Sequence, residues 1–244
     1  SQEDIIRSIL KKQDTFAVLP TGGGKSYCFQ GPSFCFVGIT LVITPLVALI
    51  QDQVKNFNSV YKKLYTRYKN GEEGITGSPY YQGELYRAIY PGMKNLSLKQ
   101  LFDEIAHPHE WDEWDTEHKV QYKLLYVSPE RLSNPKFIRE FKRREAKGEI
   151  NIDFVVVDEA HCMSQWGFDF RESYLTVGKF ISQLQKRPVI AAFSATVTQQ
   201  DRQQITTLLK LKKDTPFFLC YAKRSNLQLS IIHCADEKKK NTDE

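Results

Sequence analysis

The sequence predicts an α/β fold in which a mostly parallel central sheet carries helices on both of its faces. Short runs of Val, Ile, Leu and Phe recur along the chain, as expected of strands that are buried on both sides. Stretches of helical length separate these runs, so successive strands need crossover connections and pair in parallel. With 244 residues, of which 41 % are hydrophobic, the chain can build a substantial core.

Each predicted strand is a short apolar and β-branched run that ends near Gly, Pro or polar residues. The strands are expected at residues 15–20, 40–45, 123–128, 152–157, 189–194 and 217–221. Helices are expected between them, at residues 3–12, 24–34, 46–58, 134–147, 172–186 and 198–210. Gly148 is suited to stop the fourth helix, and Thr198 with Asp201 has the pattern of a capping box for the last one.

Two stretches depart from this alternation. Residues 59–121 contain Gly, Pro, several tyrosines and an acidic cluster, and are interpreted as an insertion between strands. Residues 1–225 would then form one lobe, and residues 226–244 a junction that leads into the truncated start of a second lobe. Tyr61, Tyr65 and Tyr68 have the spacing of a packed helix face, which we favour over stacking on DNA.

A glycine-rich segment follows the first predicted strand and opens a helix. Its consecutive glycines let backbone N–H groups turn inward around phosphates, the lysine adds charge, and the serine hydroxyl can reach Mg²⁺. Three glycines alone are most often a turn, and the strict P-loop pattern has glycine where Leu19 stands, but the strand before and the helix after favour phosphate binding. The candidate nucleotide ligands are Thr21, Gly22, Gly23, Gly24, Lys25 and Ser26.

A second polar segment, Asp158-Glu159-Ala160-His161, directly follows the apolar run 154–157. Ligands of doubly wound sheets sit at the carboxyl ends of the strands, where this segment and the glycine-rich loop both fall. Ser26 and Asp158 are expected to hold Mg²⁺, and Glu159 to orient or deprotonate an attacking water. Together the two segments predict Mg²⁺-dependent binding and hydrolysis of a nucleoside triphosphate.

Net charge and cysteine content indicate which partners and which kinds of site to expect. The net charge is +5, and because residues 103–117 hold seven acidic and no basic side chains, the rest of the chain carries +12, which favours a polyanionic partner. The five cysteines are scattered, so buried small side chains in a reducing compartment are expected rather than a disulfide framework or a zinc site. The histidines at 107, 109 and 118 fit no common zinc spacing either.

With Cys162-Met-Ser-Gln-Trp166-Gly-Phe168-Asp-Phe170-Arg171 also in view, the chain resembles the first RecA-like lobe, a DEAH-box ATPase of P-loop type, of RecQ-family superfamily 2 DNA helicases. The resemblance covers nearly the whole chain outside the expected insertion. Phe168 and Glu172 stand where that family usually has His and Pro, and the expected insertion at 59–121 is longer than usual, which indicates a divergent member. Four further segments carry the likeness: Thr44-Pro45-Leu46, Tyr126-Val-Ser128-Pro129, Phe193-Ser194-Ala195-Thr196 and Arg224-Ser-Asn226-Leu227.

The resemblance implies roles for individual residues. Gln2 would read adenine, and Thr44, Pro45 and Ser128 would belong to the nucleic-acid face. His161, Ser194 and Thr196 would sense the γ-phosphate, although a strand end that caps a helix remains an alternative for the last two. The aromatic segment, Trp166, Phe168, Phe170 and Arg171, would stack single-stranded DNA and couple it to ATP, with ordinary aromatic packing as the alternative.

The leading hypothesis is therefore an ATP-dependent DNA helicase or translocase with ATP and Mg²⁺ as cofactors. Its expected partners are single-stranded or forked DNA and a second RecA-like lobe of the parent chain. An RNA helicase of the same superfamily and a nucleotide-gated clamp without unwinding stay open as alternatives. We expect an intracellular protein, near the nucleoid in a bacterium or nuclear in a eukaryote, because no membrane span or signal peptide is indicated. The isolated lobe should be nearly inactive.

Overall fold

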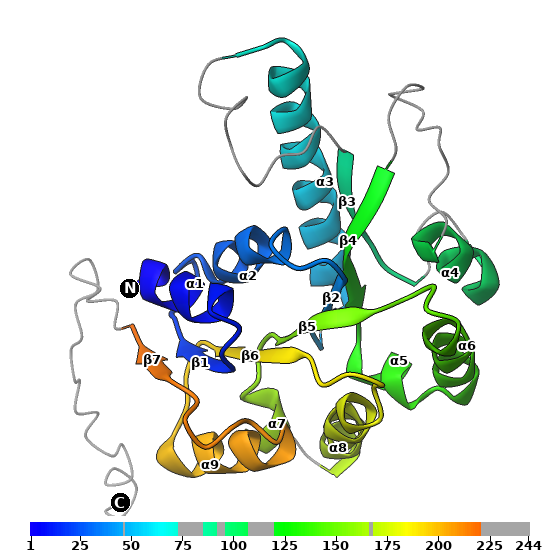
Figure 1. The fold of residues 1–244 in the computed structure, drawn as a ribbon. Coiled ribbons are helices and arrows are strands. Elements are labelled where there is room, and N and C mark those ends of the chain that lie inside the picture. The colour runs from blue at the N-terminus through cyan, green and yellow to red at the C-terminus, as the bar shows by residue number, and fades with distance from the viewer. Residues whose placement is uncertain (46, 73–84, 92–95, 107–119, 166–167, 221–244) are drawn as a thin grey trace, which may run out of the picture.

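The computed structural model describes residues 1–45, 47–72, 85–91, 96–106, 120–165 and 168–220 (Figure 1). Its strands form one sheet in the order β3-β4-β2-β5-β6-β1-β7, and every neighbouring pair is parallel. The predicted α/β fold is confirmed. The strands are β1 Thr15–Val18, β2 Ile39–Ile43, β3 Leu85–Ile89, β4 Val120–Val127, β5 Ile152–Val157, β6 Val189–Ser194 and β7 Phe217–Leu219.

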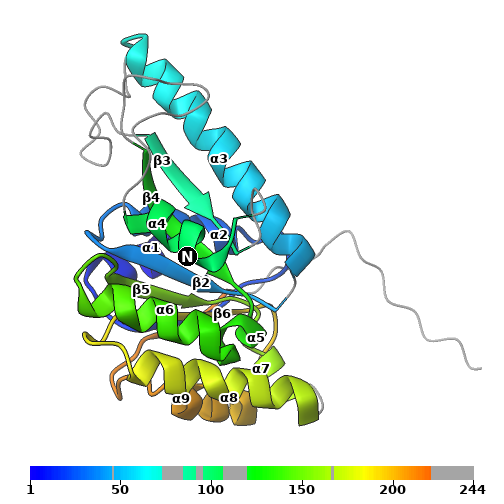
Figure 2. The same cartoon turned by 90° about the vertical axis from the view of Figure 1, so that its right-hand side faces the viewer.

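Helices cover both faces of this sheet, as expected of parallel strands joined by crossovers. Helices α1 to α3 lie on one face, and the later helices lie on the other (Figures 1 and 2). Their bounds are α1 Gln2–Leu10, α2 Lys25–Ser33, α3 Val47–Lys69, α4 Leu98–Ala106, α5 Pro129–Ser133, α6 Pro135–Ala146, α7 Cys162–Gln165, α8 Phe168–Ser182 and α9 Gln199–Leu208.

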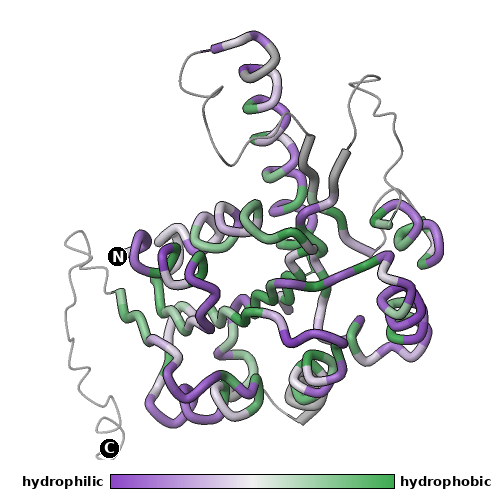
Figure 3. The backbone as a smooth tube through the Cα atoms, viewed as in Figure 1, coloured by the Kyte–Doolittle hydropathy of each residue, from purple (hydrophilic) through white to green (hydrophobic). Residues whose placement is uncertain are grey.

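The alternation of side chains along each strand divides the core in two. On β5, Phe154 and Val156 pack with α1, α2 and α3, whereas Val155 and Val157 pack with helices of the opposite face. Both sets are completely buried. This explains why the strands are continuously apolar in sequence, and Figure 3 shows the hydrophobic residues gathered on the central strands.

Local signals in the sequence place several helix ends correctly. Gly148 follows α6 with φ +71°, the left-handed conformation that lets a glycine end a helix. At α9, the Thr198 hydroxyl accepts from the backbone N–H of Asp201, whose carboxylate accepts from the backbone N–H of Thr198. The expected capping box is confirmed.

The range 59–121 contributes more to the fold than an insertion would. Helix α3 continues to Lys69, well past the expected end at residue 58, because no breaker occurs before Gly71. Tyr65 is buried and Tyr61 packs on Phe57, with ring centroids 4.4 Å apart, so a packed helix face is confirmed for these two tyrosines. Two elements in this range were not predicted: β3, which pairs with β4 at the sheet edge, and α4. The acidic cluster at 107–117 lies outside the described residues.

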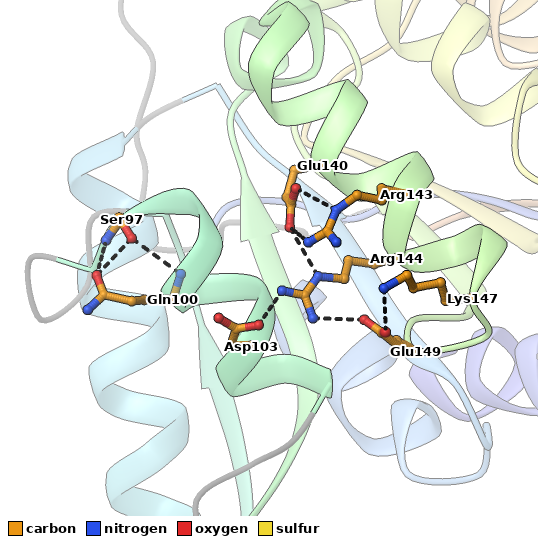
Figure 4. Close-up of polar contacts among 8 residues, drawn as sticks. All are labelled: Ser97, Gln100, Asp103, Glu140, Arg143, Arg144, Lys147 and Glu149. Atoms are coloured by element: carbon orange, nitrogen blue, oxygen red, sulfur yellow. Dashed lines mark hydrogen bonds and ion pairs between the residues drawn. The ribbon is translucent and has the colours of Figure 1, made fainter.

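A charge cluster fastens α4 to α6. The guanidinium of Arg144, on α6, donates to Asp103 of α4, to Glu140 and to Glu149 (Figure 4). Arg144 is buried, whereas Asp103 is 45 % exposed. A planar guanidinium can satisfy three carboxylates at once, so one arginine holds the α4 segment against the body of the domain.

The four described cysteines divide into two environments. Cys28 and Cys162 are buried, as expected, but Cys35 is exposed and Cys220 is half-buried. Cys35 follows the last turn of α2, and Cys234 lies outside the described residues. No helix among the described residues is long and apolar enough to cross a membrane.

Candidate active site

The glycine-rich loop joins β1 to α2 in a conformation that only glycine adopts easily. Gly22 and Gly24 have φ of +76° and +77°, and a Cβ on Gly23 would lie 2.8 Å from the carbonyl oxygen of Pro20. Gly24 is the N-cap of α2 and offers no side chain to the first N–H groups of that helix. The loop therefore aims uncapped backbone donors and a helix dipole at one place, as an anion-binding site requires.

Gln2 contacts this loop directly. It is the first residue of α1, which Ser1 and Asp4 start with a capping box. The side-chain amide of Gln2 donates to the carbonyl oxygen of Gly23 at 2.7 Å. A Cβ on Gly24 would clash with the same amide, at 2.2 Å. The residue that the resemblance places at adenine thus lies beside the phosphate loop, although 21 residues separate them along the chain.

Lys25 and Glu159 meet across the end of the sheet. Lys25 Nζ lies 2.5 Å from Glu159 Oε1, and the two side chains are only 11 % and 22 % exposed. Glu159 has φ +49°, a left-handed conformation that costs a residue other than glycine about 1 kcal/mol. Its backbone N–H donates to Asp158 Oδ1 at 3.0 Å, which closes the tight turn after β5. The two sequence segments therefore form one site.

Asp158 is the most enclosed carboxylate of this site. Its backbone N–H donates to the carbonyl of Ile43 on β2, and its side chain is buried. Burial raises the pKa of Asp158, while the nearby Lys25 acts in the opposite direction. A raised carboxyl pKa marks a place where added positive charge is favourable.

The oxygen atoms near Asp158 are of the kinds that bind a divalent cation. Glu159 Oε2 and Gln53 Oε1 are buried and accept no hydrogen bond from the described residues. Carboxylate, amide and hydroxyl oxygens are the ligands that Mg²⁺ prefers, and unsatisfied buried acceptors are costly unless something fills their place. Ser26, the second residue of α2, adds a hydroxyl on the loop side. Gln53 of α3 was not singled out as a ligand from the sequence, because it occurs among other polar residues of an amphipathic helix.

His161, Ser194 and Thr196 also come together. His161 Nδ1 lies 3.1 Å from Ser194 Oγ, and that hydroxyl donates to the carbonyl oxygen of Thr196 at 2.5 Å. Because the serine proton is used in this second bond, His161 Nδ1–H must be the donor in the first. The same nitrogen lies 3.4 Å from Glu159 Oε2. Thr196 takes part through its backbone.

The expected nucleic-acid residues divide into two groups. Thr44, Pro45 and Ser128 follow β2 and β4, which are neighbours in the sheet, so they share its carboxyl edge. The hydroxyl of Thr44 is buried and has no partner among the described residues, and Ser128 is the N-cap of α5 without a side-chain bond. Within the described part of the chain, no hydrogen bond or ion pair joins these three residues to the Lys25–Glu159 pair.

The aromatic segment was expected to form a loop before a helix that begins at residue 172. This is wrong for the second half of the segment, which is helical. Phe168, Phe170 and Arg171 lie in the first turn of α8, four residues before the expected start of that helix. No proline or glycine separates Phe168 from residue 172, so nothing delays the helix. Trp166 lies outside the described residues.

Comparisons with known proteins agree with this geometry. A family model described as DEAD/DEAH box helicase matches residues 1–205. The chain belongs to this family. It is 34 % identical over 98 % of its length to a probable ATP-dependent DNA helicase RecS and 32 % identical over 95 % to the ATP-dependent DNA helicase RecQ, both of Bacillus subtilis. The resemblance to RecQ helicases is therefore confirmed.

This DEAD/DEAH box chain spans only part of its relatives, namely 40 % of RecS and 32 % of RecQ. Among solved structures, the DUF1998 helicase MrfA bound to DNA matches 89 % of the chain with a TM-score of 0.59 and 16 % identity, and the match covers 25 % of that protein. This likeness supports the expected RecA-like fold.

Proposed function

We propose that the chain is the N-terminal motor lobe of a RecQ-type ATP-dependent DNA helicase or translocase. The observation that carries the proposal is the 2.5 Å contact between Lys25 of the phosphate loop and Glu159 after β5. The contact brings the ammonium that would bind phosphate to the carboxylate that would act on water. The chain in which they meet is a member of the DEAD/DEAH box family.

The Lys25–Glu159 pair suggests how nucleotide binding prepares hydrolysis. Without nucleotide, the ammonium neutralises the carboxylate that would serve as base. The β- and γ-phosphates carry several negative charges and would compete for Lys25 together with the N–H groups of the loop. Glu159 would then lose its partner and become free to orient or deprotonate water. The base is thus exposed only when substrate is present.

Mg²⁺ would be held by Ser26 and Asp158, and it supplies charge neutralisation of the phosphates. The chain's own residues perform the remaining work. His161 contacts both Glu159 and Ser194 through one nitrogen, at 3.4 and 3.1 Å, so a change at Glu159 would alter the bond to β6. Ser194 donates a hydrogen bond to Thr196, which precedes the N-cap of α9 by two residues. These contacts would connect the nucleotide site to that helix.

The proposed partners are DNA and a second RecA-like lobe in the same parent protein. Thr44, Pro45, Ser128 and the segment containing Trp166, Phe168, Phe170 and Arg171 would form the DNA face. A single lobe leaves the transferred phosphoryl without an arginine finger from the opposite side, which is worth roughly 10³–10⁵ in rate. We therefore expect these 244 residues to bind nucleotide weakly and to hydrolyse it at a negligible rate.

The decisive experiment measures ATP turnover and separation of a forked duplex by the full-length protein, with single-stranded DNA and RNA of the same sequence as activators. DNA should stimulate turnover more than RNA. Glu159→Gln should retain nucleotide binding but lose turnover, because an amide cannot accept the proton. Glu130→Gln, at an exposed carboxylate, is the matched control.

Equal stimulation by RNA would favour the RNA-helicase alternative, and turnover without strand separation would favour a clamp. If Glu159→Gln lost nucleotide binding, Glu159 would have to serve the metal instead. Trp166→Ala should leave basal turnover unchanged and reduce its stimulation by DNA.

A further inference from the structure

A cavity lies at the amino ends of the strands. It has a volume of about 550 Å³, within the range of small-molecule sites, and its walls come from the turn after α1 and from the residues that precede β2, β5, β6 and β7. Because every strand is parallel, this edge is opposite the edge that carries Lys25 and Glu159. In Figure 2, β3 points toward the side where α5 and α7 lie, and the cavity belongs to the other side.

Positive charge dominates the lining. Four cationic side chains border the cavity, against the single carboxylate of Asp153. Two of the cations are already neutralised. Lys186 Nζ lies 3.1 Å from Asp153, and the Arg187 guanidinium donates through both of its terminal nitrogens to Asp14, which lies behind the wall. The remaining two are Lys12 and Lys212, and neither ammonium has a hydrogen bond or ion pair within the described part of the chain.

Contacts within the fold hold these two lysines at the same cavity. Asp14 is buried, lies two residues after Lys12, and accepts from the backbone N–H of Lys212 at 3.0 Å. One carboxylate thus fastens the turn after α1 to the loop before β7. Lys12 also has φ +57°, a conformation that glycine would adopt without strain. A lysine at this position is unfavourable for the backbone, and residues in such conformations cluster at functional sites.

Part of the wall is apolar. Val37 is 94 % exposed, and Phe36, Pro188 and Val189 continue the surface from the loops before β2 and β6. The exposed Cys35 also lines the cavity. A ligand that combines negative charge with a flat or apolar body would therefore match both kinds of lining.

We propose that this cavity binds a nucleoside phosphate, either a free nucleotide or the phosphorylated end of a nucleic-acid strand. Two unpaired ammonium groups match a terminal phosphate, which carries nearly two negative charges at neutral pH, better than a single carboxylate. The apolar wall would receive the nucleoside. The site is separate from the nucleotide site at Lys25 and does not depend on the function proposed above.

Cys35 provides a direct readout of occupancy. In protein carrying Lys25→Ala, so that the phosphate loop does not contribute, the rate at which iodoacetamide alkylates Cys35 is followed by peptide mass spectrometry. Adenosine monophosphate should slow the reaction at least about fivefold at saturation, whereas adenosine at the same concentration should not. A 5′-phosphorylated dinucleotide, compared with its unphosphorylated form, tests the strand-end source. If neither phosphate compound protects Cys35, or if adenosine protects equally, the proposal is wrong.

Matched variants separate a site from general positive charge. Lys12→Gly with Lys212→Ala removes both ammonium groups, and glycine fits the backbone of residue 12. Lys11→Ala with Lys213→Ala removes the same charge from exposed neighbours that do not line the cavity. The first pair should raise the concentration for half-protection at least about tenfold, because two charged hydrogen bonds are lost, and the second should leave it within about twofold. Equal shifts in both pairs would overturn the proposal.

Discussion

The carboxylates at the two edges of the sheet differ in how completely they are hydrogen-bonded. At the amino edge, Asp14 is buried and accepts from the side chain of Arg187 and from the backbone N–H groups of Ile190 and Lys212. At the carboxyl edge, Glu159 has Lys25 on one oxygen, while its other oxygen is buried and accepts no hydrogen bond from the described residues. Both oxygens of Asp14 thus accept hydrogen bonds from described residues, whereas only one oxygen of Glu159 does.

The difference separates structural polar groups from functional ones. A buried carboxylate with all of its partners holds loops in place, because each lost bond would leave a donor unsatisfied. A buried carboxylate with a vacant oxygen costs stability, and proteins retain such groups where a ligand, water or substrate completes the set. Mutations at the carboxyl edge should therefore change function more than stability, and those at the amino edge should do the reverse.

The largest effect is expected from Lys25→Ala. ATP turnover by the full-length protein should fall at least about 10²-fold, because the site loses the cation that stabilises charge on the phosphates. The free energy of unfolding should change by less than about 1 kcal/mol, since Glu159 can be hydrated at the rim. Colorimetric phosphate release and urea denaturation measure the two quantities, with Lys11→Ala as control. Turnover within a few-fold of wild type would refute the assignment of the phosphate loop.

Asp14→Ala should produce the largest loss of stability. Removing this carboxylate leaves the Arg187 guanidinium and two backbone N–H groups without their acceptor, so the free energy of unfolding should fall by about 3–5 kcal/mol. Urea denaturation measures the change, and Asp214→Ala, at an exposed carboxylate, is the control. A loss below about 1 kcal/mol would show that the amino edge does not depend on this hub.

Glu140→Gln tests the charge cluster of Figure 4 and should have a smaller, pH-dependent effect. Hydrogen bonds from Arg143 and then Arg144 lower the pKa of Glu140 from 4.5 to about 2. Its contribution is complete above the unfolded-state value near 4.5 and is lost as the pH falls toward 2. The variant should be about 1 kcal/mol less stable at pH 7, and the difference should shrink in denaturation curves taken below pH 4.5. A difference independent of pH would contradict this electrostatic origin.

The smallest effect is expected from Thr198→Ala, which removes the hydroxyl from the capping box of α9. The free energy of unfolding should fall by about 1 kcal/mol, as for other N-cap threonines. Turnover should be unchanged, because the described contacts of Thr198 do not include the Lys25–Glu159 pair. Thr207→Ala on the same helix provides the comparison in thermal unfolding and ATPase assays. A loss of turnover would mean that α9 positions the Ser194–Thr196 segment more tightly than its contacts indicate.

The sequence alone determined those features that depend on neighbouring residues. Apolar runs identified six of the seven strands, Gly148 and Thr198 marked helix ends, and the glycine-rich loop and the Asp158–His161 segment identified the candidate site. These signals are local because strand burial, capping and backbone conformation are set within a few residues. They failed at β3, a five-residue strand interrupted by Arg87 that forms no continuous apolar run, and at α3, whose helix continues without a clear boundary.

Only the tertiary structure decided which distant residues meet. Lys25 and Glu159 are 134 residues apart and Asp14 and Lys212 are 198 apart, yet each pair is in contact because parallel strands place all their amino ends on one edge and all their carboxyl ends on the other. No periodicity in the chain predicts that Lys12 and Lys212 share a cavity, or that one oxygen of Glu159 accepts no hydrogen bond from the described residues. Sheet order sets these contacts, since strand pairing, and not sequence distance, fixes what lies beside each loop.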